Sequence, residues 1–228
     1  MSSNGNGNGN GNGSGRTGWR SLLGGRGRAH EDALAPYRRI ALQLNYDLSH
    51  AHPLRSALIV TAAGSGACAD GIIELSACLA NEVNRCVLLV DAAVKDRSLS
   101  RNLGCDSYAG LTDFLAEPGG MPLSSLALPT THANLSFLPS GLKPLPGTAG
   151  PDSMKALIEA AEQRYEAVLF AGGSALANPL VMFLAPQAAC VLLFAAANKT
   201  RKEDFDAEHD VLTYCQARKV GVVLATDL

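Results

Sequence analysis

The sequence lacks any run of about 18 apolar residues, and its first residues contain no continuous apolar segment. A membrane-spanning helix needs about 20 predominantly apolar residues, and a secretory signal peptide needs an apolar central segment. Membrane spanning and export are therefore both unsupported, and we expect a cytoplasmic protein.

The sequence also lacks CxxC pairs and an excess of positive charge. Its six cysteines fall within apolar runs, which favours buried reduced thiols over a zinc site. The first 30 residues contain four of the 19 basic residues and no acid, which leaves 15 basic residues against 21 acidic ones in the rest of the chain. Because nucleic-acid binding depends mainly on neutralising phosphates with Lys and Arg, we expect no nucleic-acid partner.

Residues 1–30 differ in composition from the rest of the chain. Asn and Gly alternate over residues 4–13, and Gly, Ser and Arg dominate to about residue 29. This composition has too little apolar surface to offset chain entropy, so we predict a disordered tail. Within it, Trp19 lies among leucines and arginines, which suits a short peptide for docking on a partner or an anionic membrane surface. The alternative is an ordinary solvated linker.

Residues 31–228 are predicted to form one α/β domain. Apolar residues recur every three or four positions from Asp32 to Leu48, which predicts an amphipathic helix with Pro36 in its first turn. Six short apolar runs alternate with longer helical patterns, and such runs are typical of a doubly wound parallel sheet covered on both faces. The predicted strands are Ser56–Thr61, Cys86–Asp91, Leu135–Leu138, Ala167–Phe170, Cys190–Phe194 and Val220–Ala225. The later predicted helices are 71–84, 110–116, 152–164, 176–184 and 201–217.

In such a sheet, ligands bind at the carboxyl ends of the strands, which points to the segment after the first strand. This segment contains Gly64, Ser65 and Gly66, the glycine spacing of a phosphate-binding loop. A working P-loop also needs a lysine for the β and γ oxygens and a Ser or Thr hydroxyl for magnesium. The segment 61–70 contains no lysine.

Several short motifs follow one another in an order that is typical of one protein family. They are Tyr37-Arg38-Arg39, Leu88–Ala92 with Arg97-Ser98-Leu99, Gly110–Leu115, Asn134–Gly141 and Val191–Arg201. On these motifs, the chain from about Ala35 to Leu228 resembles the cytoplasmic domain of bacterial tyrosine kinases (BY-kinases) associated with polysaccharide co-polymerases. That family lies within the wider MinD and ParA-like P-loop group. The resemblance implies a P-loop NTPase-like fold with a mostly parallel sheet.

The chain departs from this family at the positions that hold the nucleotide. The match places Ala69 at the phosphate-binding lysine and Asp70 at the magnesium-binding hydroxyl residue. Asp91 remains from the Asp-x-Asp motif after the second strand, whereas Ala93 and Ala171 replace two further aspartates. A carboxylate near the γ-phosphate costs on the order of 4 kcal/mol at roughly 4 Å and an effective dielectric near 20. We therefore expect neither ATP nor magnesium to bind.

Two of the acidic residues suggest roles of their own. A carboxylate in the first turn of a helix accepts unpaired amide hydrogens, typically worth about 1 kcal/mol for a cap, so we hypothesise that Asp70 occupies the anion site itself. For Asp91 we favour a structural role, bonding to loop amides, over that of a lone general base. Arg97 is the nearby residue that could instead contact an anion.

The resemblance also bears on self-association. In the family, the leading helix carries Glu-x-x-Arg-x-x-Arg, through which subunits pair into rings. The matching positions here are Ala35, Arg38 and Ala41, which keep one charge of three. Arg38 is therefore a candidate interface residue, and a homo-oligomer is one expected partner.

Further candidates for an interface are Trp19, Arg97, Lys199 and Arg201. The last two lie in a stretch that, in the family, follows the fifth strand near the nucleotide base and the subunit surfaces. Ser174 lies on a glycine turn but has no base suggested for it, so we interpret it as part of a plain loop.

These patterns favour a non-catalytic regulatory or scaffold protein, in effect a pseudokinase. We expect it to serve bacterial exopolysaccharide biosynthesis and export, of capsule, holdfast or cellulose type. It would dock on a membrane polysaccharide co-polymerase or synthase and so lie peripherally at the inner membrane. The alternatives are an active ATP-dependent tyrosine autokinase or ATPase with a diverged loop, and a MinD or ParA-like positioning accessory of polysaccharide synthesis.

Overall fold

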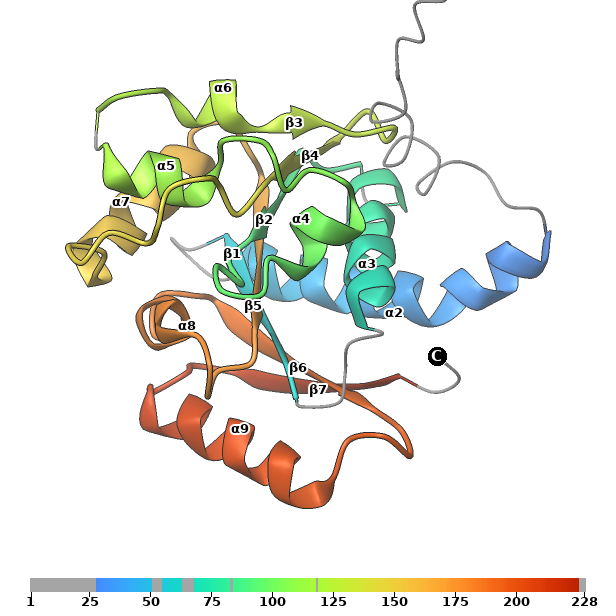
Figure 1. The fold of residues 1–228 in the computed structure, drawn as a ribbon. Coiled ribbons are helices and arrows are strands. Elements are labelled where there is room, and N and C mark those ends of the chain that lie inside the picture. Colours follow the sequence, from blue (N-terminus) through green and yellow to red (C-terminus); the bar gives the residue numbers. More distant parts are fainter. Residues whose placement is uncertain (1–27, 51–54, 63–67, 83, 118, 226–228) are drawn as a thin grey trace, which may run out of the picture.

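A computed structural model describes residues 28–50, 55–62, 68–82, 84–117 and 119–225. They build one mostly parallel sheet with helices on both faces, which confirms the predicted fold class (Figure 1). The strands are β1 (Ser56–Thr61), β2 (Val87–Asp91), β3 (Leu128–Pro129), β4 (Leu135–Leu138), β5 (Ala167–Gly173), β6 (Cys190–Ala196) and β7 (Val220–Ala225). The helices are α2 (Arg28–His50), α3 (Cys68–Glu82), α4 (Ser98–Asn102), α5 (Leu111–Ala116), α6 (Leu123–Leu126), α7 (Pro151–Glu162), α8 (Pro179–Leu184) and α9 (Lys202–Tyr214).

The order across the sheet is β3-β4-β2-β5-β1-β6-β7. Every neighbouring pair is parallel except β3 with β4. Parallel neighbours follow from connections that cross one face of the sheet through a helix. All of β2 is buried, which explains its uninterrupted apolar sequence before Asp91. The order places β2, β5 and β1 side by side in the middle of the sheet.

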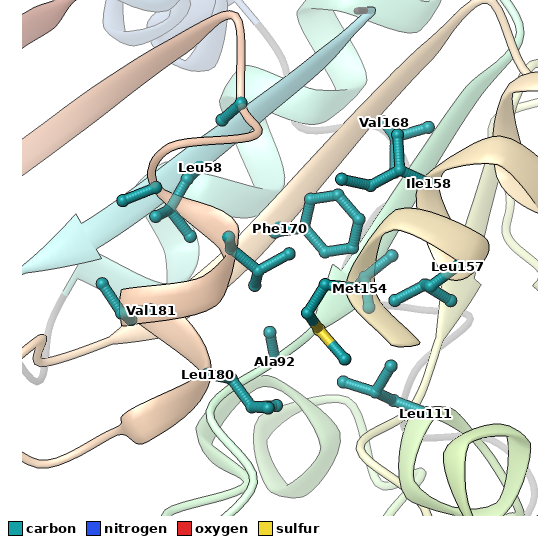
Figure 2. Packing of buried hydrophobic residues seen from close by; sticks show 14 of the residues in the cluster. Leu58, Ala92, Leu111, Met154, Leu157, Ile158, Val168, Phe170, Leu180 and Val181 are labelled. Atoms are coloured by element: carbon teal, nitrogen blue, oxygen red, sulfur yellow. The ribbon is translucent and has the colours of Figure 1, made fainter. Parts of the chain in front are cut away.

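Two hydrophobic layers cover the two faces of the sheet. Helices α2, α3 and α4 pack on one face, and α5 to α9 pack on the other. Figure 2 shows the second layer, where Met154 and Leu157 of α7 and Leu180 of α8 gather around Phe170 of β5. Full burial of a Leu or Phe side chain contributes about 1.5–3 kcal/mol relative to exposure, so both layers contribute strongly to stability.

The six predicted strands are all present, but some element boundaries differ. Helix α2 begins at Arg28, so Pro36 lies inside it and not in its first turn as predicted. Strands β5 and β6 continue to Gly173 and Ala196, beyond the apolar runs that predicted them. The short elements α4, α6 and β3 were not predicted, because runs of two to five residues carry too little periodicity.

All six cysteines are free thiols, and five of them are buried as predicted. Cys86 differs, because it lies exposed just before β2. Burial raises the pKa of the Cys190 thiol to about 12, which keeps that side chain neutral. Among the described residues, no helix combines the length and the hydropathy needed to cross a membrane.

Candidate functional site

The positions matched to nucleotide ligands converge at one edge of the sheet. Asp91, the last residue of β2, is paired in register with Ala171 of β5, and Ala171 is paired with Ile59 of β1. Because these strands are parallel neighbours, their carboxyl ends open onto the same edge, where ligands bind in such sheets. Residues 63–67, which contain the predicted phosphate-binding glycines, lie outside the described residues.

Ala69 and Asp70 lie in the first turn of α3. The Asp70 side chain is exposed, and its Oδ1 accepts a hydrogen bond of 3.2 Å from Asn102 Nδ2, which links α3 to α4. The hypothesis that Asp70 fills the anion site concerns the amides of residues 63–67. It therefore stays a prediction.

The Asp91 carboxylate is fully buried and bonded through both oxygens. Its Oδ1 accepts from the Ala93 amide at 3.2 Å, and its Oδ2 accepts from the Ser100 amide at 2.8 Å and the Ser100 hydroxyl at 2.7 Å. Helix α4 follows Arg97, whose left-handed backbone (φ 49°) is not accompanied by a side-chain cap. Asp91 therefore supplies, from the adjacent strand, the acceptor that an N-cap side chain ordinarily provides.

The same network reaches the end of β4. The Ser100 hydroxyl accepts from the Ser140 amide at 2.9 Å, and Arg97 Nε donates to Ser140 Oγ at 2.9 Å. Arg97 Nη2 also donates to the backbone carbonyl of Asp106. The Arg97 guanidinium is thus hydrogen-bonded within the chain, where it holds two loops together. Neither the anion contact nor the interface role considered for Arg97 anticipates this use.

Burial raises the pKa of the Asp91 carboxyl above its ordinary value, while the Ser100 and Ala93 hydrogen bonds and the Arg97 charge act in the opposite direction. A general base must reach the proton that it abstracts within hydrogen-bond distance. Asp91 has no exposed surface and both of its oxygens face protein donors. In this arrangement the carboxylate holds the loop and is turned away from solvent.

Ala93 and Ala171 are both buried beside Asp91. The Ala92 amide donates to the Ala171 carbonyl at 2.9 Å, which ties the ends of β2 and β5 together. A Cβ added to Gly173 would lie 3.2 Å from the Ala93 methyl group, so a side chain at residue 173 would crowd that methyl. Magnesium takes oxygen ligands, chiefly carboxylates and water, and methyl groups offer none. Ala93 and Ala171 therefore supply no oxygen ligand for magnesium at the described part of this edge.

Asn178, which the sequence did not single out, joins the same two strands. Its buried Nδ2 donates to the carbonyls of Ala92 and Gly172, both at 2.7 Å, and its Oδ1 accepts from the Leu180 amide at 3.1 Å. The side chain thereby caps α8 and fixes the backbone after Asp91 to the end of β5. No local sequence pattern predicts that Asn178 joins these two strands, because one partner lies 86 residues earlier in the chain.

Ser174 lies in the turn after β5, and it has an acidic partner that the sequence did not suggest. Buried Glu208 of α9 accepts from the Ser174 hydroxyl and, at 2.7 Å, from the Ala175 amide. Burial raises the pKa of Glu208, while these hydrogen bonds oppose the rise. Its carboxylate caps the turn after β5 and does not form part of a base–nucleophile relay. The spacing of Phe205, Glu208 and Leu212 along one helical face is the sequence signal that could have revealed it.

The remaining interface candidates lie in different parts of the molecule. Arg38 forms a half-exposed ion pair of 3.0 Å with Glu82, which joins α2 to α3 and is worth about 0–1 kcal/mol. Ala41, the next of these family positions, is fully buried on the inner face of α2, where a long charged side chain such as the family's second arginine would be buried too. Lys199 and Arg201 are exposed between β6 and α9, and Trp19 lies outside the described residues.

The described residues contain no group of three His, Cys, Asp or Glu side chains that could hold a metal ion. Across the described part of the edge, the polar side chains bond to backbone amides, to carbonyls and to one another. This arrangement is suited to fixing a surface in one conformation.

Comparisons with known proteins locate the chain by its fold. No protein-family model and no curated protein sequence matches it. The crystal structure of the chimerical protein CapA2B2 aligns with a TM-score of 0.71 at 16% identity and covers 88% of each chain. The kinase domain of the Escherichia coli tyrosine kinase ETK aligns with a TM-score of 0.70 at 20% identity, covering 85% of this chain and 75% of that one.

The MinD cell division protein of Aquifex aeolicus aligns less closely, with a TM-score of 0.54 at 16% identity, over 74% of this chain and 68% of its own. The neighbours thus include both groups to which the sequence motifs point. At the level of the fold, they confirm the resemblance to bacterial tyrosine kinase domains and to MinD-like P-loop proteins.

Proposed function

We propose that this protein is a non-catalytic regulatory or scaffold protein of bacterial exopolysaccharide biosynthesis and export. It docks in the cytoplasm on a membrane polysaccharide co-polymerase or synthase and lies peripherally at the inner membrane through that partner. It takes the place of an active tyrosine kinase without binding ATP or magnesium.

The proposal rests mainly on the residues at the carboxyl ends of β2 and β5, where the resemblance places the ligands of a nucleotide. Ala93 and Ala171 present methyl groups where the resemblance implies carboxylates. The buried Asp91 carboxylate accepts hydrogen bonds from Ser100 and so caps α4. At the start of α3, Ala69 and Asp70 stand where the resemblance implies the phosphate-binding lysine and the magnesium-binding hydroxyl residue. Restoring one residue would leave the others unfit for magnesium.

The pathway and the partner rest on the sequence resemblance. The motifs match kinase domains that work with polysaccharide co-polymerases, and one of the aligned structures is a tyrosine kinase domain. Function transferred through a shared fold is an analogy, which makes the partner the part that most needs an independent test.

An active autokinase or ATPase with a diverged loop is the competing function, and nucleotide binding separates the two. A ligand at 100 times its dissociation constant stabilises the folded state by about 2.7 kcal/mol. In a domain of this size that corresponds to a rise of roughly 5–10 °C in Tm. We expect millimolar ATP with magnesium to leave the Tm unchanged, whereas the ETK kinase domain, used as the positive control, should be stabilised.

The docking step needs its own experiment. The full chain, tagged and expressed in its own cells, should recover a membrane polysaccharide co-polymerase or synthase after crosslinking. Recovery of no such protein would contradict the partner while leaving the nucleotide result standing. A rise in Tm with ATP would contradict the non-catalytic role whatever the pull-down shows.

A further inference from the structure

The two edges of the sheet are built very differently. The β3 edge is only two residues long and ends in Pro129, which cannot donate to a ladder. The β7 edge is six residues long and contains no charged residue and no proline. Natural proteins usually protect an edge strand with charge, proline, a bulge or short length, because its unpaired backbone is a template for another strand.

Hydrogen bonds among the described residues show which backbone groups of β7 they leave open. The carbonyls of Lys219 and Ala225 accept from β6, at 2.7 Å from Val191 N and 2.8 Å from Ala197 N. In a parallel ladder, a residue directs its N–H and C=O to the same side, and successive residues alternate. The odd-numbered residues of β7 therefore face β6, and Val220, Val222 and Leu224 present their N–H and C=O groups to the open edge.

The side chains along this edge are also apolar and exposed. Val222 is 56% exposed and Leu224 is 62% exposed. Both belong to the sheet face on which α9 packs, because Val222 is paired in register with buried Leu193. An open row of backbone groups flanked by aliphatic side chains is the combination that strand addition uses.

We propose that β7 pairs with β7 of a second copy of this chain, antiparallel about a two-fold axis, so that the two sheets become continuous. Even-numbered residues lie opposite one another, which lets Val220, Val222 and Leu224 satisfy their open backbone groups. The interface is isologous, as in most homodimers. This inference is independent of the proposed function.

Charge favours this occupant and this direction. Exposed Arg218 precedes β7, next to Lys219, whose ammonium is paired with Asp47 at 2.7 Å, so a parallel partner would bring the two Arg218 charges together. Antiparallel pairing of six residues separates the two cationic ends by roughly 20 Å, well beyond a Debye length of about 8 Å. The chain's own N-terminal segment is a less suitable occupant of the edge. It has four arginines among its first 30 residues and would add positive charge near Arg218.

The first test is the mass in solution of the full chain between about 1 and 100 µM, by light scattering or sedimentation. The wild-type mass should approach twice 23.7 kDa as the concentration rises. Val222→Lys should remain at 23.7 kDa, because two lysines would face each other across the axis. The matched control is Leu176→Lys, a 58% exposed apolar residue in the turn after β5, which should dimerise like the wild type.

The second test uses the unaltered protein and removes any doubt about folding of the variant. Amide exchange at Val220, Val222 and Leu224 should slow as the concentration rises, while Gly221 and Val223 stay protected throughout. A wild type that keeps the mass of one chain, or a Val222→Lys variant that dimerises like its control, would overturn the proposal. So would protection of the three open amides in a monomer, since the chain itself would then cover the edge.

Discussion

Asp91 stands where the resemblance implies a ligand of the magnesium–nucleotide pair. In this chain its carboxylate has a structural role. Three donors converge on its buried carboxylate, two of them from Ser100 at the start of α4. A carboxylate that accepts several hydrogen bonds can remain buried, whereas the donors left by its removal have no water to replace it. Its contribution should therefore appear as stability.

Replacing Asp91 with Ala leaves the amides of Ala93 and Ser100 and the Ser100 hydroxyl without their acceptor. Each unsatisfied buried group costs about 1–3 kcal/mol, so we expect the free energy of unfolding to fall by about 3 kcal/mol. Urea unfolding measures the loss. Asp70→Ala, which removes an exposed carboxylate bonded to Asn102 among the described residues, should cost less than about 1 kcal/mol. Equal losses for the two variants would contradict the capping role of Asp91.

Glu208 gives a pH dependence whose sign follows from burial. Burial raises its pKa in the folded protein above the ordinary value of 4.5, so folding favours the protonated form. The stabilisation that this provides is fully present below the unfolded pKa and is lost as pH rises through the folded pKa. The unfolding free energy of the wild type minus that of Glu208→Gln should therefore decrease as pH rises from about 4 upwards. A difference that grows over this range would mean that the hydrogen bonds outweigh burial.

At the scale of elements, two sequence motifs lock together. Gly110 begins the Gly-Leu-Thr-Asp-Phe-Leu motif, and the amides of Leu111 and Thr112 donate to the carbonyls of Pro139 and Ser140 after β4. Asp113 Oδ2 accepts from the amides of Gly110 and Leu142 at 2.9 and 2.8 Å. The start of α5 and the loop after β4 therefore form one unit.

Gly110→Ala should disrupt this unit. An added Cβ would lie 2.0 Å from the Pro139 carbonyl oxygen, a backbone atom that moves only if the loop moves. We expect a loss of at least about 3 kcal/mol in the free energy of unfolding, in the range of severe core disruption. Gly147→Ala is the matched control, because nothing lies within 4 Å of the added Cβ and its effect should stay within about 0.5 kcal/mol. Comparable losses in urea unfolding would contradict the interlock.

The same elements show what the sequence could predict. Most of the predicted strands were found because a parallel strand buried on both faces reads as a continuous apolar run. Strand β7 reads the same way although it lies at the edge and is partly exposed. Strand β3 was missed because it is two residues long and makes an antiparallel edge. At the site, the resemblance placed Asp91 and Ala171 at the carboxyl ends of their strands. Helical spacing could have shown that Glu208 is buried, but it could not identify Ser174, 34 residues away, as its partner. The partners of Asn178 could not be predicted either, because one of them lies 86 residues earlier.

For the whole molecule, one sheet lies between both hydrophobic layers, and the candidate site is at the carboxyl ends of its central strands. Strands β2, β5 and β1 are buried by α3 on one face and by α7 and α8 on the other. Their carboxyl ends are then joined by side chains, through Asp91 to α4 and through Asn178 to α8. Ligands of doubly wound sheets bind at these carboxyl ends, and in this chain side chains at the same ends connect the two layers.

This arrangement predicts that the two layers unfold together. Leu79 of α3 and Leu157 of α7 are fully buried on opposite faces, and truncation of either to Ala should cost about 2–5 kcal/mol. Calorimetry should show one transition for each variant, shifted to a lower temperature, because the central strands belong to both layers. Leu42→Ala, at an exposed position of α2, should leave the transition in place. Two transitions, of which each variant moves a different one, would show that the sheet does not couple its two faces.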